Sequence, residues 1–473
     1  MSDSGEAGFS GNPGDATPGV IVLEGCAIAT MDESGTEFSA GHVVVDGSTI
    51  VAVGSGNAPD FDTTGAEVRR VDARGCLATP GLVNTHHHLY QWGTRGMAAD
   101  ATLFEWLTAL YPVWSRLDAS LVRPLASAAL GWLAKTGCST TMDHHYLFPR
   151  SGGDVLGATV AAAREIGLRF HPTRGSMDLG ASAGGLPPDD VVETRDEILA
   201  ATQEAIEEYH DGAPDSMLRV GVAPCSPFSV TAELLVEAAE LARRAGVRLH
   251  THLAETKDED EYCADRFGCT PVEYLDSLGW LGDDVWLAHT VHLNDADIGT
   301  LAQSATSVAH CPSSNARLGA GICRTRALVD AGVLVGLGVD GSASNEESSL
   351  LGEVRQAALM ARAAGGPQAM SVRDALRLAT IGGAWVLGRA AEIGSLEKFK
   401  LADIALWRLD TLAHAGIADP VAALVLGPPA PLELLLVGGR TVVERGALRT
   451  ASEAEIAARA RSASRRLMAG ART

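Results

Sequence analysis

The sequence predicts an α/β fold, in which a (β/α)8 barrel is flanked by a small β-sandwich domain. Three observations lead to this prediction. Short apolar strand candidates alternate with helical stretches through the middle of the chain, polar residues close almost every such strand, and both ends of the chain are rich in strands. Alternating strands and helices indicate a parallel sheet, and eight such units indicate a TIM barrel.

Strand candidates of similar composition lie near the two termini. They occupy residues 20–31, 42–54 and 68–81 on one side and residues 402–410 and 432–448 on the other. We expect residues 19–80 and 388–450 to assemble one composite β-sandwich. Residues 1–18 lack the basic and apolar regions of a signal peptide and predict a disordered tail. The alanine, glutamate and arginine spacing of residues 451–473 predicts a C-terminal helix.

The barrel is expected over residues 81–387. Its eight strand candidates are residues 81–88, 139–146, 168–175, 218–227, 247–255, 285–293, 306–315 and 334–344. Helical stretches such as residues 120–137 and 231–246 separate them. Catalytic groups of such barrels sit at the carboxyl ends of the strands, which is where the histidines and acids of this sequence fall.

The segment PGLVNTHHHLYQ ends the first strand with His86 and His88 two residues apart. Residues i and i+2 of a strand point to the same side, so both imidazoles can face one point, whereas His87 points away and is not expected to be a ligand. His252 on the fifth strand and Asp340 on the eighth would complete the set. Three neutral nitrogens and one carboxylate suit a single Zn²⁺, or Fe²⁺ if a fifth ligand is added. The alternative is a group of core histidines with ordinary hydrogen bonds.

Two residues are candidates for proton transfer beside the metal. Glu255 follows His252 by three residues, so a turn can bring its carboxyl group over a bound water, where a general base must lie. The alternative is a solvated loop glutamate, because the acidic run KDEDE follows. His289 ends the sixth strand and could contact the attacking water or a substrate carbonyl; the alternative is a structural histidine. With Asp340, these residues form the expected catalytic set.

Weaker candidates for substrate contacts also lie at strand ends. Gln91 follows the metal motif and could read the amide edge of a substrate. Arg174 follows the third strand and could pair with a carbonyl or an anion through its planar guanidinium group. The sequence leaves open whether His144, His145 or His310 contributes to the site.

Composition narrows the possible function classes. The chain carries 59 acidic and 37 basic residues, a formal charge of −22, which disfavours nucleic acid and anionic membrane surfaces as partners. The most apolar late stretch, VAALVLGPPAPLELLLVGG, is too interrupted to span a membrane. Eight cysteines without a CxxC pair suggest reduced thiols and a cytoplasmic protein. No GxSxG motif supports a serine hydrolase.

Several motifs resemble those of a known family. PGLVNTHHH, HTHLAE, LAH and GVDGSAS resemble the amidohydrolase superfamily, in the branch that contains cytosine, guanine and S-adenosylhomocysteine deaminases and s-triazine hydrolases. HHHLYQ, TMDHHYLFP, RGSMDLGASAGGLPPDDVV and GVDGSASNE are most similar to the 8-oxoguanine deaminases within that branch. The resemblance extends over roughly residues 20–450.

This resemblance implies a role for each matching residue. The implied metal ligands are His86, His88, His252 and Asp340. Glu255 would protonate the ring nitrogen next to the carbon under attack, Asp340 would accept a proton from the attacking water, and His289 would contact water and substrate. Gln91 and Arg174 fall where family members contact the heterocycle. The fourth strand candidate contains no lysine that could bridge two metals, as in binuclear relatives, which argues for one metal.

The implied function is hydrolytic deamination, at a C–N bond of a cyclic amidine, of an amino-substituted purine-like heterocycle. The best single expectation is conversion of 8-oxoguanine to urate and ammonia. The alternatives are an s-triazine amino- or chlorohydrolase of the hydroxyatrazine type and a guanine, isocytosine or S-adenosylhomocysteine deaminase. Lactam hydrolysis and a non-catalytic scaffold are further alternatives of other classes. We expect a small heterocycle and water as partners, and a homodimer or larger homo-oligomer.

Overall fold

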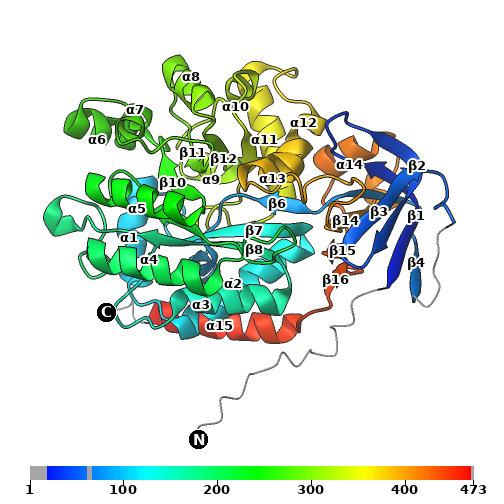
Figure 1. Cartoon of the computed structure of the whole chain (residues 1–473), viewed down its shortest axis with the longest axis horizontal. Coiled ribbons are helices and arrows are strands. Elements are labelled where there is room, and N and C mark those ends of the chain that lie inside the picture. Colours follow the sequence, from blue (N-terminus) through cyan, green and yellow to red (C-terminus); the bar gives the residue numbers. More distant parts are fainter. Residues whose placement is uncertain (1–18, 61–66, 470–473) are drawn as a thin grey trace, which may run out of the picture.

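The computed structural model of the protein describes residues 19–60 and 67–469. Its two sheets lie side by side, one forming a helix-covered barrel and the other a smaller domain that contains strands from both ends of the chain (Figure 1). The disordered tail expected for residues 1–18 and the last four residues of the expected C-terminal helix lie outside the described residues.

Eight parallel strands form the barrel sheet, as the sequence predicts. They are β6 (Leu82–Asn84), β7 (Cys138–His145), β8 (Arg169–Ser176), β9 (Gly221–Pro224), β10 (Leu249–Leu253), β11 (Val285–His289), β12 (Ser307–His310) and β13 (Val335–Leu337). Hydrogen bonds bring the first and last strands together: the Thr85 N–H donates to the Leu337 carbonyl at 2.9 Å, and the Asp340 N–H donates to the His86 carbonyl at 3.1 Å. The fold is therefore a nearly closed (β/α)8 barrel.

The second sheet combines strands from both termini, again as predicted. Its nine strands are β1 (Val20–Ala29), β2 (Glu37–Asp46), β3 (Thr49–Ser55), β4 (Val68–Asp72), β5 (Cys76–Pro80), β14 (Ile404–Arg408), β15 (Leu432–Val437), β16 (Arg440–Glu444) and β17 (Ala447–Leu448). The antiparallel pairing of β5 with β14 joins the N-terminal strands to the C-terminal ones in one continuous sheet. The residue limits that we assigned to the domains stay a prediction.

Helices surround the barrel and cover its ends (Figure 1). They are α1 (Leu103–Trp114), α2 (Ala119–Lys135), α3 (Val155–Ile166), α4 (Arg195–Tyr209), α5 (Ala232–Ala245), α6 (Lys257–Phe267), α7 (Pro271–Ser277), α8 (Asp295–Gln303), α9 (Pro312–Arg317), α10 (Thr325–Asp330), α11 (Leu350–Gly365), α12 (Val372–Arg377), α13 (Gly383–Val386), α14 (Pro420–Leu426) and α15 (Glu453–Ala469). The 3₁₀ helices η1 (Leu89–Thr94), η2 (Ala181–Ala183) and η4 (Leu412–His414) and the π-helical segment η3 (Leu378–Gly382) complete the elements of the described residues. Among the residues described, no helix has the length and apolar character needed to cross a membrane.

Capping residues mark where several of these helices begin. The Asp118 side chain accepts a hydrogen bond from the Leu121 N–H at the start of α2. Thr194 and Glu197 form a capping box at the start of α4. Such caps satisfy N–H groups that have no partner within the helix. The capping residues therefore define where α2 and α4 begin.

A buried ion pair joins the barrel to the terminal sheet. Arg169 on β8 donates from Nε to Asp403 Oδ2 at 2.9 Å and from Nη2 to Oδ1 at 3.1 Å, and both side chains are buried. Asp403 immediately precedes β14, and its Oδ1 also accepts the Gly438 N–H at 2.7 Å. The pair is bidentate and fully enclosed, so the two sheets are held in one fixed arrangement here.

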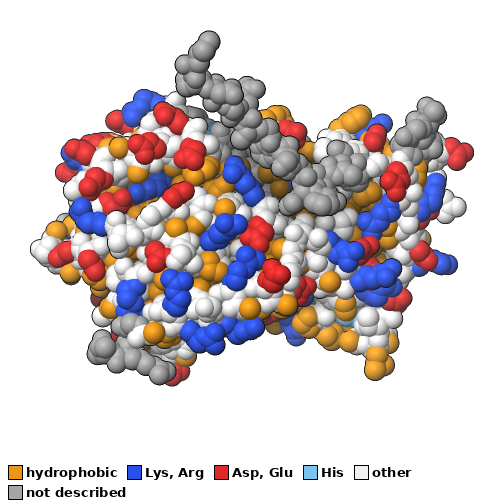
Figure 2. All heavy atoms as spheres, turned by 90° about the horizontal axis from the view of Figure 1, so that it is seen from below, with side chains coloured by type: hydrophobic (Ala, Val, Ile, Leu, Met, Phe, Trp, Pro, Cys, Tyr) orange, Lys and Arg blue, Asp and Glu red, His pale blue; other side chains and the backbone are white. Residues whose placement is uncertain are grey.

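Helix α15 packs along the lower side of the barrel in Figure 1, beside α2 and α3. The face seen from below carries interspersed basic and acidic side chains (Figure 2). Charged side chains of α15 pair with those of neighbouring helices: Arg459 on α15 contacts Glu165 on α3 at 3.0 Å, and Lys135 on α2 contacts Glu453 on α15 at 2.5 Å. The C-terminal helix is thus attached to the barrel by contacts of opposite charge.

Candidate active site and metal centre

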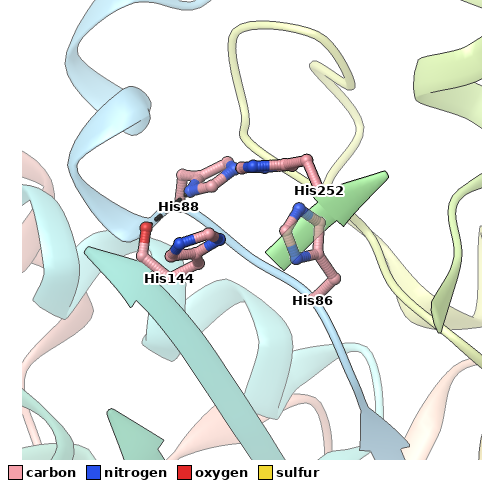
Figure 3. A group of neighbouring side chains, drawn as sticks. All are labelled: His86, His88, His144 and His252. Carbon is pink, nitrogen blue, oxygen red and sulfur yellow. Dashed lines mark hydrogen bonds between the residues drawn. The ribbon is translucent and has the colours of Figure 1, made fainter. Parts of the chain in front are cut away.

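Four histidine side chains meet at the carboxyl ends of the barrel strands (Figure 3). His86 and His88 follow β6, His144 lies on β7 and His252 lies on β10. Each offers one ring nitrogen, and these nitrogens all lie within 4.8 Å of one another. His88 Nε2 and His252 Nε2 lie 3.1 Å apart. All four side chains are buried, so the nitrogens face one another rather than solvent.

Asp340 adds a carboxylate to this cluster from the loop that follows β13. Its Oδ1 lies 3.3 Å from both His86 Nε2 and His88 Nε2. Its Oδ2 accepts hydrogen bonds from Ser314 Oγ at 2.5 Å and from Ser344 Oγ at 3.0 Å. One oxygen is therefore held by hydroxyl groups while the other remains directed at the histidines.

The remaining ring nitrogens of three histidines are fixed by hydrogen bonds. His88 Nδ1–H donates to the His144 carbonyl at 2.7 Å, and His252 Nδ1–H donates to the Cys225 carbonyl at 2.7 Å. His86 Nδ1 lies 2.8 Å from His250 Nε2, and His250 Nδ1–H donates to a backbone carbonyl at 2.8 Å, so His86 is the donor in that pair. Each Nε2 therefore keeps its lone pair.

The residues fit a divalent metal ion. Burial lowers the pKa values of His86, His88 and His252, which keeps the imidazoles neutral and able to bind metal. His86 Nε2 is buried and has no hydrogen-bond partner, as expected of an atom whose natural partner is a metal. Three neutral nitrogens, one carboxylate oxygen and hydrogen bonds that orient the imidazoles are the arrangement of metal centres in hydrolases.

Glu255 and His289 face each other next to the metal-binding cluster. Glu255 Oε2 lies 3.6 Å from His289 Nε2, and both side chains are buried. Burial raises the pKa of Glu255 to about 7, although His289 acts in the opposite direction. Burial alone would lower the pKa of His289, but the carboxylates of Glu255 and Asp340 outweigh it and raise that pKa. Burial thus favours the protonated form of Glu255, and the neighbouring carboxylates favour the protonated form of His289.

These residues line a cavity with a volume of about 30 Å³. Its polar lining comes from the residues around the metal-binding cluster, namely His88, His252, Glu255, His289 and Asp340. Its apolar and aromatic lining comes mainly from α1, with Leu103, Trp106, Leu107 and Tyr111, and also from Phe228 and Leu318. Gln91 also lines the cavity, and its buried Oε1 has no hydrogen-bond partner. A mostly apolar pocket with a few directed polar groups suits a flat heterocycle.

The structure brings together most of the residues that the sequence suggested, but Arg174 lies apart from them. Arg174 does not line the cavity: its Nη2 donates to Glu193 Oε1 at 2.7 Å, and its guanidinium carbon lies 3.5 Å from the centre of the Phe148 ring. In this structure it therefore holds a loop in place and makes no approach to the cavity. The contact between Arg174 and a substrate stays a prediction without structural support.

The neighbouring histidines take different positions. His87 accepts the His88 N–H at its Nδ1 and belongs to neither of the two metal-ligand clusters found among the described residues. His145 Nε2–H donates to the Leu147 carbonyl at 2.8 Å. His310 ends β12 but is also absent from both clusters.

His144 is the residue that sequence reasoning left open and that the structure places in the cluster. Its Nε2–H donates to the Ala223 carbonyl at 3.0 Å, while its buried Nδ1 has no partner. Its ring stacks on that of His252 with centroids 4.7 Å apart. The sequence signal for this residue is the pair His144 and His145 at the end of a buried strand. The pair does not show which of the two histidines faces the cluster, because that depends on the register of the strand.

Comparison with known proteins agrees with this geometry. The sequence model of the amidohydrolase family matches residues 77–442. The 8-oxoguanine deaminase of Pseudomonas aeruginosa is 43% identical over 445 residues, which cover 94% of this chain and 98% of that protein. The hydroxydechloroatrazine ethylaminohydrolase of Pseudomonas sp. strain ADP is 35% identical over 463 residues, which cover 94% of each chain.

A solved structure also matches over nearly the whole fold. The atrazine chlorohydrolase of Arthrobacter aurescens, complexed with zinc, superposes with a TM-score of 0.88 at 34% identity. The match covers 94% of this chain and 100% of that one. From the matched family model, the extent of these relatives and the shared fold, we conclude that this chain belongs to the amidohydrolase family.

Proposed function

We propose that the protein is a metal-dependent hydrolytic deaminase of an amino-substituted purine-like heterocycle, with 8-oxoguanine as its substrate. The reaction adds water to 8-oxoguanine and yields urate and ammonia. The observation that carries the deaminase assignment is the pairing of Glu255 with His289 at 3.6 Å in the cavity that Asp340 and the histidines also line. The relative from P. aeruginosa supports the choice of substrate.

The proposed metal is a single zinc ion, with Fe²⁺ as the alternative, held by His86, His88, His252 and Asp340. The zinc complex of the atrazine chlorohydrolase supports this choice. A metal bound there lowers the pKa of a water molecule and so supplies a nucleophile at neutral pH. One metal is proposed because β9 and the residues around it contain no lysine that could bridge a second ion.

The chain's own carboxyl groups would move the protons. Asp340 Oδ1 faces the histidines and can accept the proton of the attacking water, while its Oδ2 stays bound to the two serine hydroxyls. Glu255, whose pKa is raised to about 7, can deliver a proton to the ring nitrogen beside the carbon under attack. The proton that Asp340 accepted would then pass to the exocyclic nitrogen, so that the C–N bond breaks and ammonia leaves, and the remaining hydroxyl proton of the adduct would return to Glu255.

Other side chains would bind and orient the ring. His289 can donate to the attacking water or a ring carbonyl once it is protonated. Its Nδ1–H donates to Asn315 Oδ1 at 2.9 Å, which fixes the ring plane. The unpaired Gln91 Oε1 can accept an N–H from the amide edge of the heterocycle. The apolar walls from α1 exclude water from the other faces of the substrate.

A second candidate is hydrolysis of an N-alkylated s-triazine. The apolar residues Leu103, Trp106 and Leu107 along one wall of the cavity could accommodate an alkyl group on the leaving amine. The ethylaminohydrolase relative and the chlorohydrolase structure support this reading. An expelled alkylamine in place of ammonia would distinguish it.

The experiment that tests the proposal is release of ammonia by the zinc-loaded full chain. The substrates are 8-oxoguanine, guanine, isocytosine, cytosine, S-adenosylhomocysteine and hydroxyatrazine, with urate followed separately by its absorbance. We expect stoichiometric urate and ammonia from 8-oxoguanine. No ammonia from any substrate, with one equivalent of metal bound, would overturn the deaminase assignment. A homo-oligomeric state and a cytoplasmic location stay predictions.

A further inference from the structure

The turn that carries Glu255 is held by a second buried carboxylate, that of Glu259. Glu259 lies in the first turn of α6 and is completely buried. Its Oε1 accepts the Ala254 N–H at 2.9 Å, and its Oε2 accepts the Glu255 N–H at 3.0 Å. Both oxygens are therefore bound to consecutive backbone groups of the turn.

This arrangement differs from ordinary helix capping. In α7, for example, Glu273 reaches back to the N–H of Thr270, the residue that caps its own helix. Glu259 occupies the same third position of α6 but reaches past the capping residue Thr256 to the two residues before it. The Glu259 side chain thus accepts hydrogen bonds from the turn that precedes α6 and does not cap α6 itself.

The turn needs such support because its backbone is strained. Ala254 has a φ of +52°, a left-handed conformation that residues with a Cβ atom rarely adopt. The same strain recurs after β11, where His289 has a φ of +72° and Thr290 a φ of +44°. Conformations of this kind persist only where surrounding contacts enforce them.

The backbone of Ala254 joins the two strained turns. Its carbonyl accepts the N–H groups of Val291 at 2.8 Å and His292 at 3.0 Å, immediately after the His289 turn. Its own N–H is bound by Glu259. A contact chain therefore runs from Glu259 through the Ala254 peptide to the segment that carries His289, and it ends with Glu255 and His289 facing each other.

Backbone N–H groups of the turn hold the Glu259 carboxylate. Within residues 19–60 and 67–469, no lysine, arginine or histidine forms an ion pair with Glu259. Burial of a carboxylate without a cation is unfavourable, and the two N–H groups of the turn offset that cost, so an apolar residue at this position would leave both N–H groups without a partner. Glu259 does not line the cavity either, so it has no direct access to a substrate.

We propose that Glu259 is a positioning residue, whose carboxylate fixes the strained Ala254–Glu255 turn and so places the Glu255 carboxyl group for proton transfer. This inference rests on the proposed function, in which Glu255 is the proton donor. The role requires two acceptor oxygens at one end of the side chain. Glutamine matches the shape of glutamate but turns one acceptor into an NH₂ group that would face a backbone N–H.

The first test is independent of any substrate. Hydrogen–deuterium exchange of the metal-loaded full chain is measured for a peptide that covers residues 250–258, in the wild type, in Glu259→Gln and in Glu261→Gln. Glu261 lies in the same helix but is exposed, so its variant is the matched control. We expect at least about tenfold faster exchange of the turn amides in Glu259→Gln only. Unchanged exchange in that variant would overturn the proposal.

The second test separates a positioning role from a general loss of structure. In Glu259→Gln we expect kcat to fall about 10–100-fold, with KM and bound metal unchanged, because a small misplacement of a catalytic group has an effect of this size. In the Glu255→Gln background, the second substitution should slow residual turnover by less than about twofold. Equal effects of Glu259→Gln in both backgrounds would overturn the proposal.

Two further outcomes are distinguishable. If Glu259→Gln fails to fold, Glu259→Asp keeps both oxygens on a shorter side chain and should show faster exchange of the turn amides and an intermediate loss of kcat; wild-type exchange in that variant would contradict the role. If no substrate releases ammonia, the proposed function fails. The exchange measurement still decides whether Glu259 holds the turn.

Discussion

Ser314 and Asp340 are joined by a hydrogen bond of 2.5 Å between Ser314 Oγ and Asp340 Oδ2. Ser314 belongs to α9, whereas Asp340 follows β13, so the bond connects two separate barrel segments. It occupies one carboxylate oxygen and leaves Oδ1, 3.3 Å from two histidine Nε2 atoms, as the metal-facing atom. The rotation of the Asp340 carboxylate is thereby fixed before any metal binds.

We expect Ser314→Ala to weaken metal binding about 10–100-fold, since the loss of a partner that orients a ligand has effects of that size. Zinc affinity is measured by competition with a chelator of known affinity. Ser462→Ala, at an exposed position of α15, is the control and should bind zinc like the wild type. Wild-type affinity in Ser314→Ala would show that Ser344 alone orients the carboxylate.

Replacing His252 removes one nitrogen from the cluster. We expect His252→Ala to lose bound metal after dialysis, because two nitrogens and one carboxylate from the proposed set would remain. Metal content is measured by atomic emission against protein concentration. His310→Ala also removes a buried histidine at a strand end but should keep about one equivalent. Full metal content in His252→Ala would remove His252 from the ligand set.

Glu255→Gln is expected to keep the metal and lose turnover. Glutamine fits the same space but cannot carry the proton, so kcat should fall about 10²–10⁴-fold. The measurement is urate formation from 8-oxoguanine, with metal content determined on the same samples. Activity near that of the wild type would contradict proton transfer by Glu255, whereas Glu261→Gln is expected to be fully active.

Gln91→Leu tests the recognition of the ring. The substitution removes the unpaired buried Oε1 and puts an apolar side chain of similar size in its place. Loss of one hydrogen bond to the substrate should lower kcat/KM for 8-oxoguanine about 3–10-fold, chiefly through KM, while metal content stays unchanged. An unchanged KM would show that the amide edge of the ring is bound elsewhere.

Several features of the site could be predicted from sequence because they depend on local spacing. The two-residue periodicity of a strand places His86 and His88 on one side, and the alternation of strands and helices brings His252 and Asp340 to the same end of the barrel. Neither inference requires knowledge of side-chain conformation. The fold therefore followed from residue pattern alone, and the same pattern brought the proposed metal ligands to one end of the barrel, whereas their role as ligands stays a prediction.

The contacts that support these residues were not predictable in the same way. Glu259 appeared only as part of a charged run after Glu255, since a sequence does not show that its carboxylate turns inward toward the preceding backbone. Arg174 was expected near a substrate, but Glu193, 19 residues further along, lies close enough to pair with it. Both outcomes depend on how loops fold back, and local periodicity carries no information about that.

The enclosed pairing of Arg169 with Asp403 has a consequence for how the protein can be divided. A fragment limited to the expected barrel, residues 81–387, would leave the Arg169 guanidinium without its carboxylate partner, and an uncompensated charge of this kind destabilises a fold by about 3–5 kcal/mol. The terminal sheet therefore cannot be removed without destabilising the barrel. The barrel and the terminal sheet should melt in a single cooperative transition, so the two together form the folding unit that carries the site.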